Sequence, residues 1–215
     1  MEESALVLEI IERGSDDQGL MLVVHGYGAD QFDLVPLVPY LDPEERYRVV
    51  LPRGPVPILG AGAGWYDVGP DGSDHDGLRR SWRTLDTLLT DLCAKYGTDR
   101  ADSVLIGFSQ GAAMVLTVAL AGSTPRPQAV VAMSGYLPDV DGIDYAWSEE
   151  LPPVLVLHGS LDPVVAIDKG LSAAARLEEH GLDVTFRDYP MEHEVSMDSL
   201  ADARTWLEAK RGERR

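Results

Sequence analysis

Residues 104–121 read VLIGFSQGAAMVLTVALA, and the organisation of the whole chain follows from them. Residues 104–106 are apolar, as in a short buried strand. Residues 112–121 form a longer apolar run of good helix formers, which predicts a buried helix. Between these segments lies GFSQG at 107–111, where a glycine stands two positions away on either side of a serine. The stretch therefore predicts a strand that turns sharply into a helix.

Ser109 is the central residue of that turn. A sharp turn from strand to helix strains its central residue, and flanking glycines let the backbones pass without a Cβ clash. The Ser109 hydroxyl then stands above the sheet at a helix N-terminus, where backbone amides favour negative charge. This arrangement is typical of the nucleophile elbow of α/β-hydrolases. An ordinary glycine-rich turn is the alternative.

Length and charge limit the class of protein. The 215 residues predict one α/β domain spanning 1–215, with enough chain for a single large core. The net charge of −18 argues against nucleic acid and anionic membrane surfaces as partners. The N-terminus lacks a signal-peptide pattern, and no apolar run is long enough to span a bilayer. We therefore expect a cytoplasmic protein without stable membrane insertion.

The sequence lacks the patterns that indicate a cofactor, a metal or a disulfide. It has no phosphate-binding loop, dinucleotide fingerprint, CxxC pair or HxxxH spacing, so we predict no cofactor and no metal. Asp74-His75-Asp76 is interpreted as a solvated turn, because adjacent residues on a loop do not converge on one ion. The single cysteine, Cys93, has helical spacing with several leucines, which favours a core or half-buried thiol over a catalytic one.

Apolar segments of characteristic spacing predict the other elements. Further strands are expected at residues 5–11, 20–24, 46–51, 128–133, 153–157 and 183–189, the last at an edge of the sheet. Further helices are expected at residues 32–41, interrupted by prolines, and at 78–96, 166–180 and the C-terminus. Strands that alternate with helices predict a mostly parallel sheet with helices on both faces.

Three residues with complementary chemistry follow different predicted strands. Ser109 follows the predicted strand at 104–106, Asp162 follows the strand at 153–157, and His193 follows the strand at 183–189. In an open α/β sheet, active residues gather at the carboxyl ends of the strands. A serine hydroxyl needs a base to take its proton, and a histidine base is usually oriented by a carboxylate. We expect Ser109 to be the nucleophile, His193 the base and Asp162 the acid that orients it.

Other residues compete for the roles of base and acid. The other histidines are His25, His75, His158 and His180, and the other candidate acids are Asp139, Asp141 and Asp144. His193 is preferred because it alone lies between the last predicted strand and the last helix. Asp162 is preferred because it lies in a tight turn, with Pro163 fixing its exit. A turn-forming Asp-Pro pair without a catalytic role is the alternative.

The reaction also needs hydrogen-bond donors for the oxyanion of a tetrahedral intermediate. One donor is expected from the backbone N–H of Gln110, directly after the candidate nucleophile. The second is expected from the glycine-rich loop at residues 25–30, where the amide of Tyr27 is the natural candidate.

Residues 52–77 form a long segment without a regular pattern. A loop of this length is usually functional or disordered, and this one is too apolar for a disordered linker. We interpret it as the wall of a substrate pocket, with a plain surface loop as the alternative. The candidate pocket residues are Ile58, Leu59, Trp65 and Tyr66.

Motifs in a fixed order extend these patterns over nearly the whole chain. They are VHGYGAD at 24–30, GWYD at 64–67, GFSQG at 107–111, HGSLDPVV at 158–165 and MEHEVS at 191–196. Together they resemble the phospholipase/carboxylesterase family, which includes acyl-protein thioesterases and small bacterial carboxylesterases. The resemblance implies an α/β-hydrolase fold without a large cap domain. It also implies a triad of Ser109, Asp162 and His193, with Tyr27 and Gln110 at the oxyanion hole.

The resemblance is less specific about the substrate. It implies that residues 65–67 lie near the substrate pocket, with anchoring of their loop as the alternative. Ala112, Pro190 and Glu192 stand where the family often has glycine, and Glu192 places a carboxylate beside His193.

We expect a serine carboxylesterase or thioesterase that forms an acyl-enzyme. Its partner would be a small-molecule acyl ester or thioester of short to medium chain length, and the protein would be a monomer or a homodimer. The charge of −18 makes coenzyme A thioesters less attractive substrates. A lactone or dienelactone-type hydrolase on the same triad and a catalytically inactive binding protein are the alternatives.

Overall fold

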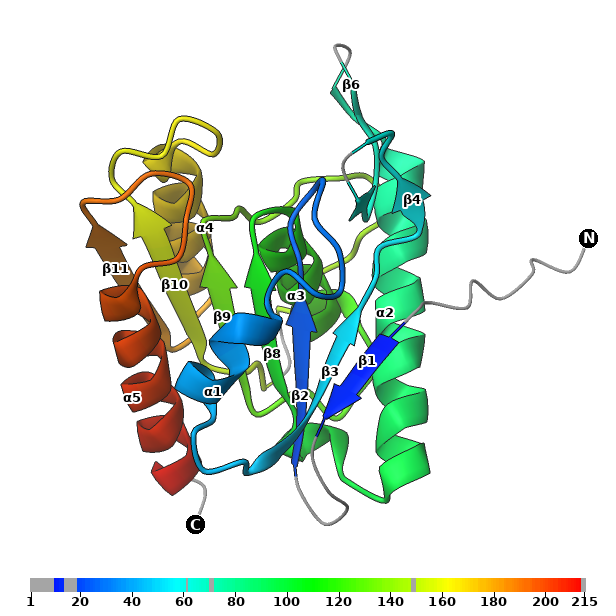
Figure 1. Ribbon diagram of the computed structural model, residues 1–215, viewed down its shortest axis with the longest axis vertical. Helices are drawn as coiled ribbons and strands as arrows, with labels where there is room; N and C mark the ends of the chain where they lie inside the picture. Colours follow the sequence, from blue (N-terminus) through cyan, green and yellow to red (C-terminus); the bar gives the residue numbers. More distant parts are fainter. Residues whose placement is uncertain (1–9, 14–18, 61, 70–71, 148–149, 214–215) are drawn as a thin grey trace, which may run out of the picture.

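In the computed structural model, which describes residues 10–13, 19–60, 62–69, 72–147 and 150–213, a central sheet is covered by helices on both faces (Figure 1). Within these residues the sheet has seven strands in the order β1-β3-β2-β8-β9-β10-β11. The strands are β1 (Ile10–Arg13), β2 (Gly19–Val24), β3 (Tyr47–Pro52), β8 (Val104–Phe108), β9 (Ala129–Met133), β10 (Val154–Gly159) and β11 (Val184–Tyr189). Only β1 pairs antiparallel, with β3, so the predicted mostly parallel sheet is confirmed.

The helices divide between the two faces of the sheet, as Figure 1 shows. They are α1 (Val38–Leu41), α2 (His75–Tyr96), α3 (Gln110–Ala121), α4 (Ile167–Glu179) and α5 (Met197–Glu213). Helices α2, α3 and α4 contribute to one hydrophobic cluster, and α1 and α5 contribute to the other. This is the α/β-hydrolase fold, and no large cap domain is present in the described part of the chain. Of the helices described, none combines the length and apolar character needed to cross a membrane.

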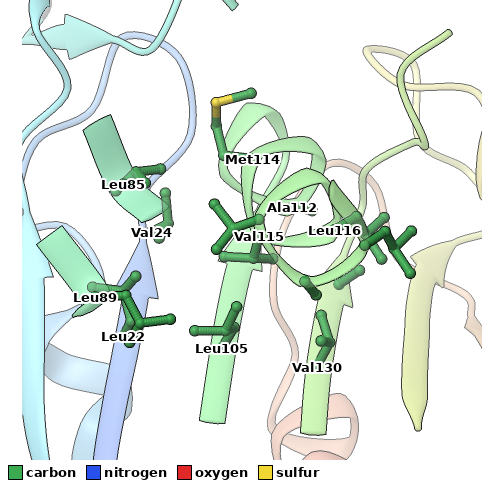
Figure 2. Packing of buried hydrophobic residues seen from close by; sticks show 14 of the residues in the cluster. Leu22, Val24, Leu85, Leu89, Leu105, Ala112, Met114, Val115, Leu116 and Val130 are labelled. Carbon is green, nitrogen blue, oxygen red and sulfur yellow. The ribbon is translucent and has the colours of Figure 1, made fainter. Parts of the chain in front are cut away.

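The sheet separates the two hydrophobic clusters because neighbouring residues of a strand face opposite sides. In β2, Leu22 and Val24 belong to the cluster with α2 and α3, whereas Met21 and Val23 belong to the cluster with α1 and α5. Figure 2 shows Leu22 and Val24 beside leucines of α2, with α3 above β8 and β9. Cys93 is buried in the first cluster, so the predicted core thiol is confirmed. Burial on both faces explains why these strands are continuously apolar.

The first turn of the long helix differs from the prediction. Helix α2 begins at His75 rather than near residue 78, because the Asp74 carboxylate accepts a hydrogen bond from the Gly77 N–H (2.9 Å) and caps the helix. The expected solvated turn at 74–76 is therefore wrong, since Asp74 is a helix cap and the next residues are helical.

Two other segments also differ from the prediction. The predicted helix at 32–41 is only a 3₁₀ turn (Val35–Leu37) followed by α1. The loop at 52–77 contains two short hairpins, β4 (Val56–Pro57) with β5 (Ala63–Gly64) and β6 (Val68–Gly69) with β7 (Gly72–Ser73). Of the strand expected at 5–11, residues 5–9 lie outside the described residues.

Candidate active site

The predicted turn from strand to helix is present between β8 and α3. Ser109 has φ 55° and ψ −118°, which residues other than glycine rarely adopt. Its N–H donates to the carbonyl of Met133 in β9 (2.8 Å). A Cβ at Gly107 would lie 2.3 Å from the Gly111 carbonyl oxygen, and one at Gly111 would lie 2.1 Å from the Val24 carbonyl oxygen. Close backbone contacts therefore require both glycines.

Ser109, Asp162 and His193 form one hydrogen-bonded chain. His193 Nε2 lies 2.9 Å from Ser109 Oγ, and His193 Nδ1 lies 2.7 Å from Asp162 Oδ2. The three residues follow β8, β10 and β11, so parallel strands bring them together at the carboxyl edge of the sheet. The distances match those expected between a nucleophile, its base and an orienting acid.

The Asp162 carboxylate is buried and held in one orientation. The backbone N–H groups of Val164 and Val165 both donate to its Oδ1 atom (2.8 Å each). Burial alone would raise the pKa of Asp162, but the hydrogen bonds from His193 and from the two amides outweigh it and lower the pKa below its ordinary value. The carboxylate is therefore ionised at neutral pH and can orient the imidazole.

Backbone contacts tie the segment that carries His193 to the turn after β10. The N–H of Leu161 donates to the Met191 carbonyl (3.1 Å). A Cβ at Gly159 would lie 2.4 Å from the same carbonyl oxygen, so a glycine is needed for this close approach. Glu192, the residue before His193, is exposed.

The amides predicted for the oxyanion hole come from two segments beside Ser109. Gln110 begins α3, so its N–H has no acceptor within the helix. Tyr27 follows Gly26, where an added Cβ would lie 3.2 Å from the Ser109 Cβ. The Tyr27 ring packs over Gly64, where an added Cβ would lie 2.8 Å from it. The loop at 25–30 therefore lies against the serine turn, and the role of its Tyr27 amide stays a prediction.

The Gln110 side chain has a second contact that the sequence analysis missed. Its Oε1 atom accepts from the Trp65 N–H (2.7 Å), and its Nε2 atom donates to the Tyr66 carbonyl (2.8 Å). The amide thus connects the serine turn to the segment at 64–67. No local sequence pattern could reveal this contact, because Gln110 and Trp65 are 45 positions apart.

The four predicted pocket residues do not lie together on one surface. Trp65 and Tyr66 have no exposed surface, whereas Leu59 is fully exposed and Ile58 is half-buried. The Tyr66 hydroxyl hydrogen-bonds to the Tyr136 hydroxyl. The pKa of Tyr66 is raised, mainly because its hydroxyl is buried and to a smaller extent because Tyr136 lies beside it. Trp65 and Tyr66 therefore anchor their loop to the core, as in the alternative interpretation, and do not form an open pocket wall.

His158 is a further residue near the triad whose position the sequence analysis missed. It has no exposed surface, its Nε2 donates to the Val165 carbonyl (2.8 Å), and it lies 3.7 Å from Asp162 Oδ2. Its Nδ1 has no hydrogen-bond partner among the described residues, and a Cβ at Gly170 would lie 2.4 Å from that atom. His158 therefore supports the turn whose amides bind Asp162.

The remaining candidates do not belong to the hydrogen-bonded chain. His25 is buried, accepts from the Gly54 N–H (2.9 Å), and has its pKa lowered by burial. His75 is exposed at the start of α2, and His180 stacks on a tryptophan at the end of α4 (ring centroids 4.0 Å apart). The other candidate acids, Asp139, Asp141 and Asp144, are all exposed.

Gly135 makes room for Ala112, which stands where the family often has glycine. Ala112 is fully buried, and a Cβ at Gly135 would lie 2.4 Å from the Ala112 Cβ. The methyl group is accommodated because the residue that faces it is a glycine.

Comparison with known proteins agrees with this architecture. Residues 6–210 match the model of the phospholipase/carboxylesterase family. The chain is 33% identical over 180 residues to acyl-protein thioesterase 1 of Debaryomyces hansenii, covering 76% of each protein. It is 31% identical over 118 residues to carboxylesterase SOBER1 of Arabidopsis thaliana, covering 53% of this chain and 51% of the relative.

Solved structures give the same result for the fold. Esterase PE8 is 29% identical and superposes with a TM-score of 0.81, covering 94% of this chain and 98% of the esterase. The carboxylesterase of Bacillus cereus has the same fold at 21% identity, with a TM-score of 0.81 and 94% of each chain covered. The chain belongs to the phospholipase/carboxylesterase family and is a carboxylic ester hydrolase.

Proposed function

We propose that this hydrolase cleaves esters or thioesters of short- to medium-chain carboxylic acids through an acyl-enzyme on Ser109. The observation that carries the proposal is the hydrogen-bonded chain from Ser109 Oγ through His193 to the buried Asp162 carboxylate. The family relatives named acyl-protein thioesterase and carboxylesterase support the same two substrate classes. The cytoplasmic location and the monomeric or homodimeric state stay predictions from the sequence.

In the proposed acylation step, Ser109 Oγ attacks the acyl carbonyl carbon while His193 Nε2 takes the hydroxyl proton. The backbone N–H groups of Tyr27 and Gln110 donate to the oxyanion of the tetrahedral intermediate. When the intermediate collapses, the bond to the leaving oxygen or sulfur breaks, and His193 gives its proton to the leaving group. Asp162 keeps the imidazole oriented and stabilises its charged form.

In the proposed deacylation step, His193 takes a proton from a water molecule that attacks the acyl carbon of the acyl-Ser109. The second tetrahedral intermediate uses the same two amide donors. Its collapse returns the proton to Ser109 Oγ and releases the carboxylic acid.

The test compares wild type with Ser109→Ala on p-nitrophenyl esters of increasing chain length. Removing the nucleophile of a serine triad lowers kcat by about 10⁶-fold, so Ser109→Ala should retain only background hydrolysis. Ser134→Ala is a matched control, because Ser134 is also buried, has φ 49°, and has a hydroxyl without a partner among the described residues. Activity that survives in Ser109→Ala, or is lost equally in Ser134→Ala, would overturn the proposal.

A further inference from the structure

A cavity of about 380 Å³ lies between the first turns of α2, residues 136–140 and α4. Its volume is within the range of cavities that bind small ligands. Tyr136 lines the cavity and follows Gly135, where an added Cβ would lie 3.0 Å from the Ser109 carbonyl oxygen. The residue before Tyr136 therefore contacts the serine turn, although no triad residue lines the cavity.

The position of the cavity indicates which half of a substrate can reach it. Helices α2, α3 and α4 lie on one face of the sheet, and α5, which follows His193, lies on the other (Figure 1). His193 must give its proton to the leaving group, so the leaving group lies on the His193 side of Ser109. The acyl group then extends in the other direction, towards the cavity.

The cavity combines an apolar wall with cationic side chains. Leu78 and Leu137 contribute to the apolar part, and Lys169 and Arg176 line it from α4. Arg176 is paired with Asp139 across the cavity (3.2 Å), which neutralises both charges. Lys169 is exposed and has no ion-pair partner among the described residues, so its ammonium group is an uncompensated positive charge at the cavity.

An uncompensated lysine is unusual on this chain, which carries 36 acidic residues and 18 lysine and arginine residues. The net charge of −18 disfavours ligands with several negative charges. A ligand with one carboxylate needs only one nearby cation, and Lys169 supplies it among the residues that line the cavity.

We propose that the cavity receives the acyl chain of the substrate and that Lys169 binds a carboxylate at the far end of that chain. The preferred substrates would then be monoesters or monothioesters of dicarboxylic acids. This inference rests on the proposed function, because the ester carbonyl must lie at Ser109. Lys169 is a specificity residue, because it does not touch the reacting atoms.

The test uses pairs of p-nitrophenyl esters of equal chain length, one ending in a methyl group and the other in a carboxylate. Wild type should prefer the carboxylate ester by about fivefold in kcat/KM at the chain length that reaches Lys169, as expected for one partly exposed ion pair. Lys169→Met should raise KM for that ester by about the same factor and leave kcat unchanged, because the contact is equal in the ground and transition states. Lys169→Arg should keep the preference.

Two controls separate this contact from general charge effects. Lys95→Met removes a lysine that is paired with Glu12 at the other end of α2, and it should keep the wild-type preference. High salt should reduce the preference of wild type, because it screens an exposed ion pair. A wild type that prefers neutral esters at every chain length, or an unchanged preference in Lys169→Met, would overturn the inference.

Binding to Ser109→Ala separates the inference from the proposed function. Isothermal titration of this variant with the monomethyl ester of a dicarboxylic acid, and with the neutral ester of equal length, needs no turnover. Tighter binding of the carboxylate ester that is lost in Ser109→Ala/Lys169→Met would support the cavity assignment even if the proposed mechanism failed. Equal binding of the two esters would overturn the assignment even if esterase activity were found.

Discussion

The side chain of Gln110 gives the sharpest prediction, because it joins two parts of the candidate site. In Gln110→Ala, the Trp65 N–H and the Tyr66 carbonyl both lose their hydrogen-bond partners. Gln110 is 4% exposed, and Trp65 and Tyr66 have no exposed surface, so water does not replace the lost amide without a rearrangement. The substitution therefore leaves one buried donor and one buried acceptor unpaired.

The expected loss follows from the energy of such groups. An unpaired buried backbone group destabilises a protein by about 1–3 kcal/mol, so two of them should lower the free energy of unfolding by about 2–6 kcal/mol. A domain of this kind has a total stability of about 5–15 kcal/mol, so the variant should fold but should unfold at clearly lower urea concentration.

Urea unfolding, followed by tryptophan fluorescence, measures this loss. Gln128→Ala is the matched control, because Gln128 is also buried but its side chain makes no hydrogen bond with the described residues. The control should lose no more than about 1 kcal/mol. A Gln110→Ala variant that is as stable as Gln128→Ala would refute the reasoning, since the two bonds would then contribute nothing.

Three further predictions concern the triad acid, a buried ion pair and the serine turn. Because hydrogen bonds hold the pKa of Asp162 below its unfolded value, its contribution to stability is complete above the unfolded pKa and is lost as pH falls through the folded pKa. Urea unfolding at several pH values measures the stability difference between wild type and Asp162→Asn, which should shrink as pH falls below about 4. A stability difference that does not change with pH would contradict this prediction. Asp86→Ala should destabilise the protein by about 3–5 kcal/mol in urea unfolding, because it leaves the buried charge of Arg100 unpaired, and a loss below about 1 kcal/mol would show that the pair matters little. Gly135→Ala should lower the melting temperature, because the new Cβ would lie 2.4 Å from that of Ala112, and Ala112→Gly in the same chain should recover part of the loss; no recovery would rule out this contact as the cause.

Much of the fold could be predicted from the sequence because the residue patterns that favour each strand, turn and helix lie within short segments of the chain. An apolar strand, a glycine-flanked serine and an apolar helix follow one another within residues 104–121, and the structure has β8, the turn and α3 there. The alternation of strands and helices is also enough to predict a parallel sheet, because parallel neighbours need a crossover between them. The start of α2 was missed because the Asp74 cap depends on backbone geometry that apolar spacing does not report.

The candidate site was predictable in its residue types and chain order, but not in its surroundings. The residue order alone was enough to predict that a serine, an aspartate and a histidine follow separate strands of a parallel sheet and therefore meet at one edge. The apolar character of Trp65 and Tyr66 did not reveal whether they face a ligand or the core, since both environments favour the same side chains. The folded structure was needed to show that they are buried, that the Gln110 amide bonds to them, and that Lys169 lies at a cavity. These contacts join residues far apart in the chain, and they exist only once the helices have packed on the sheet.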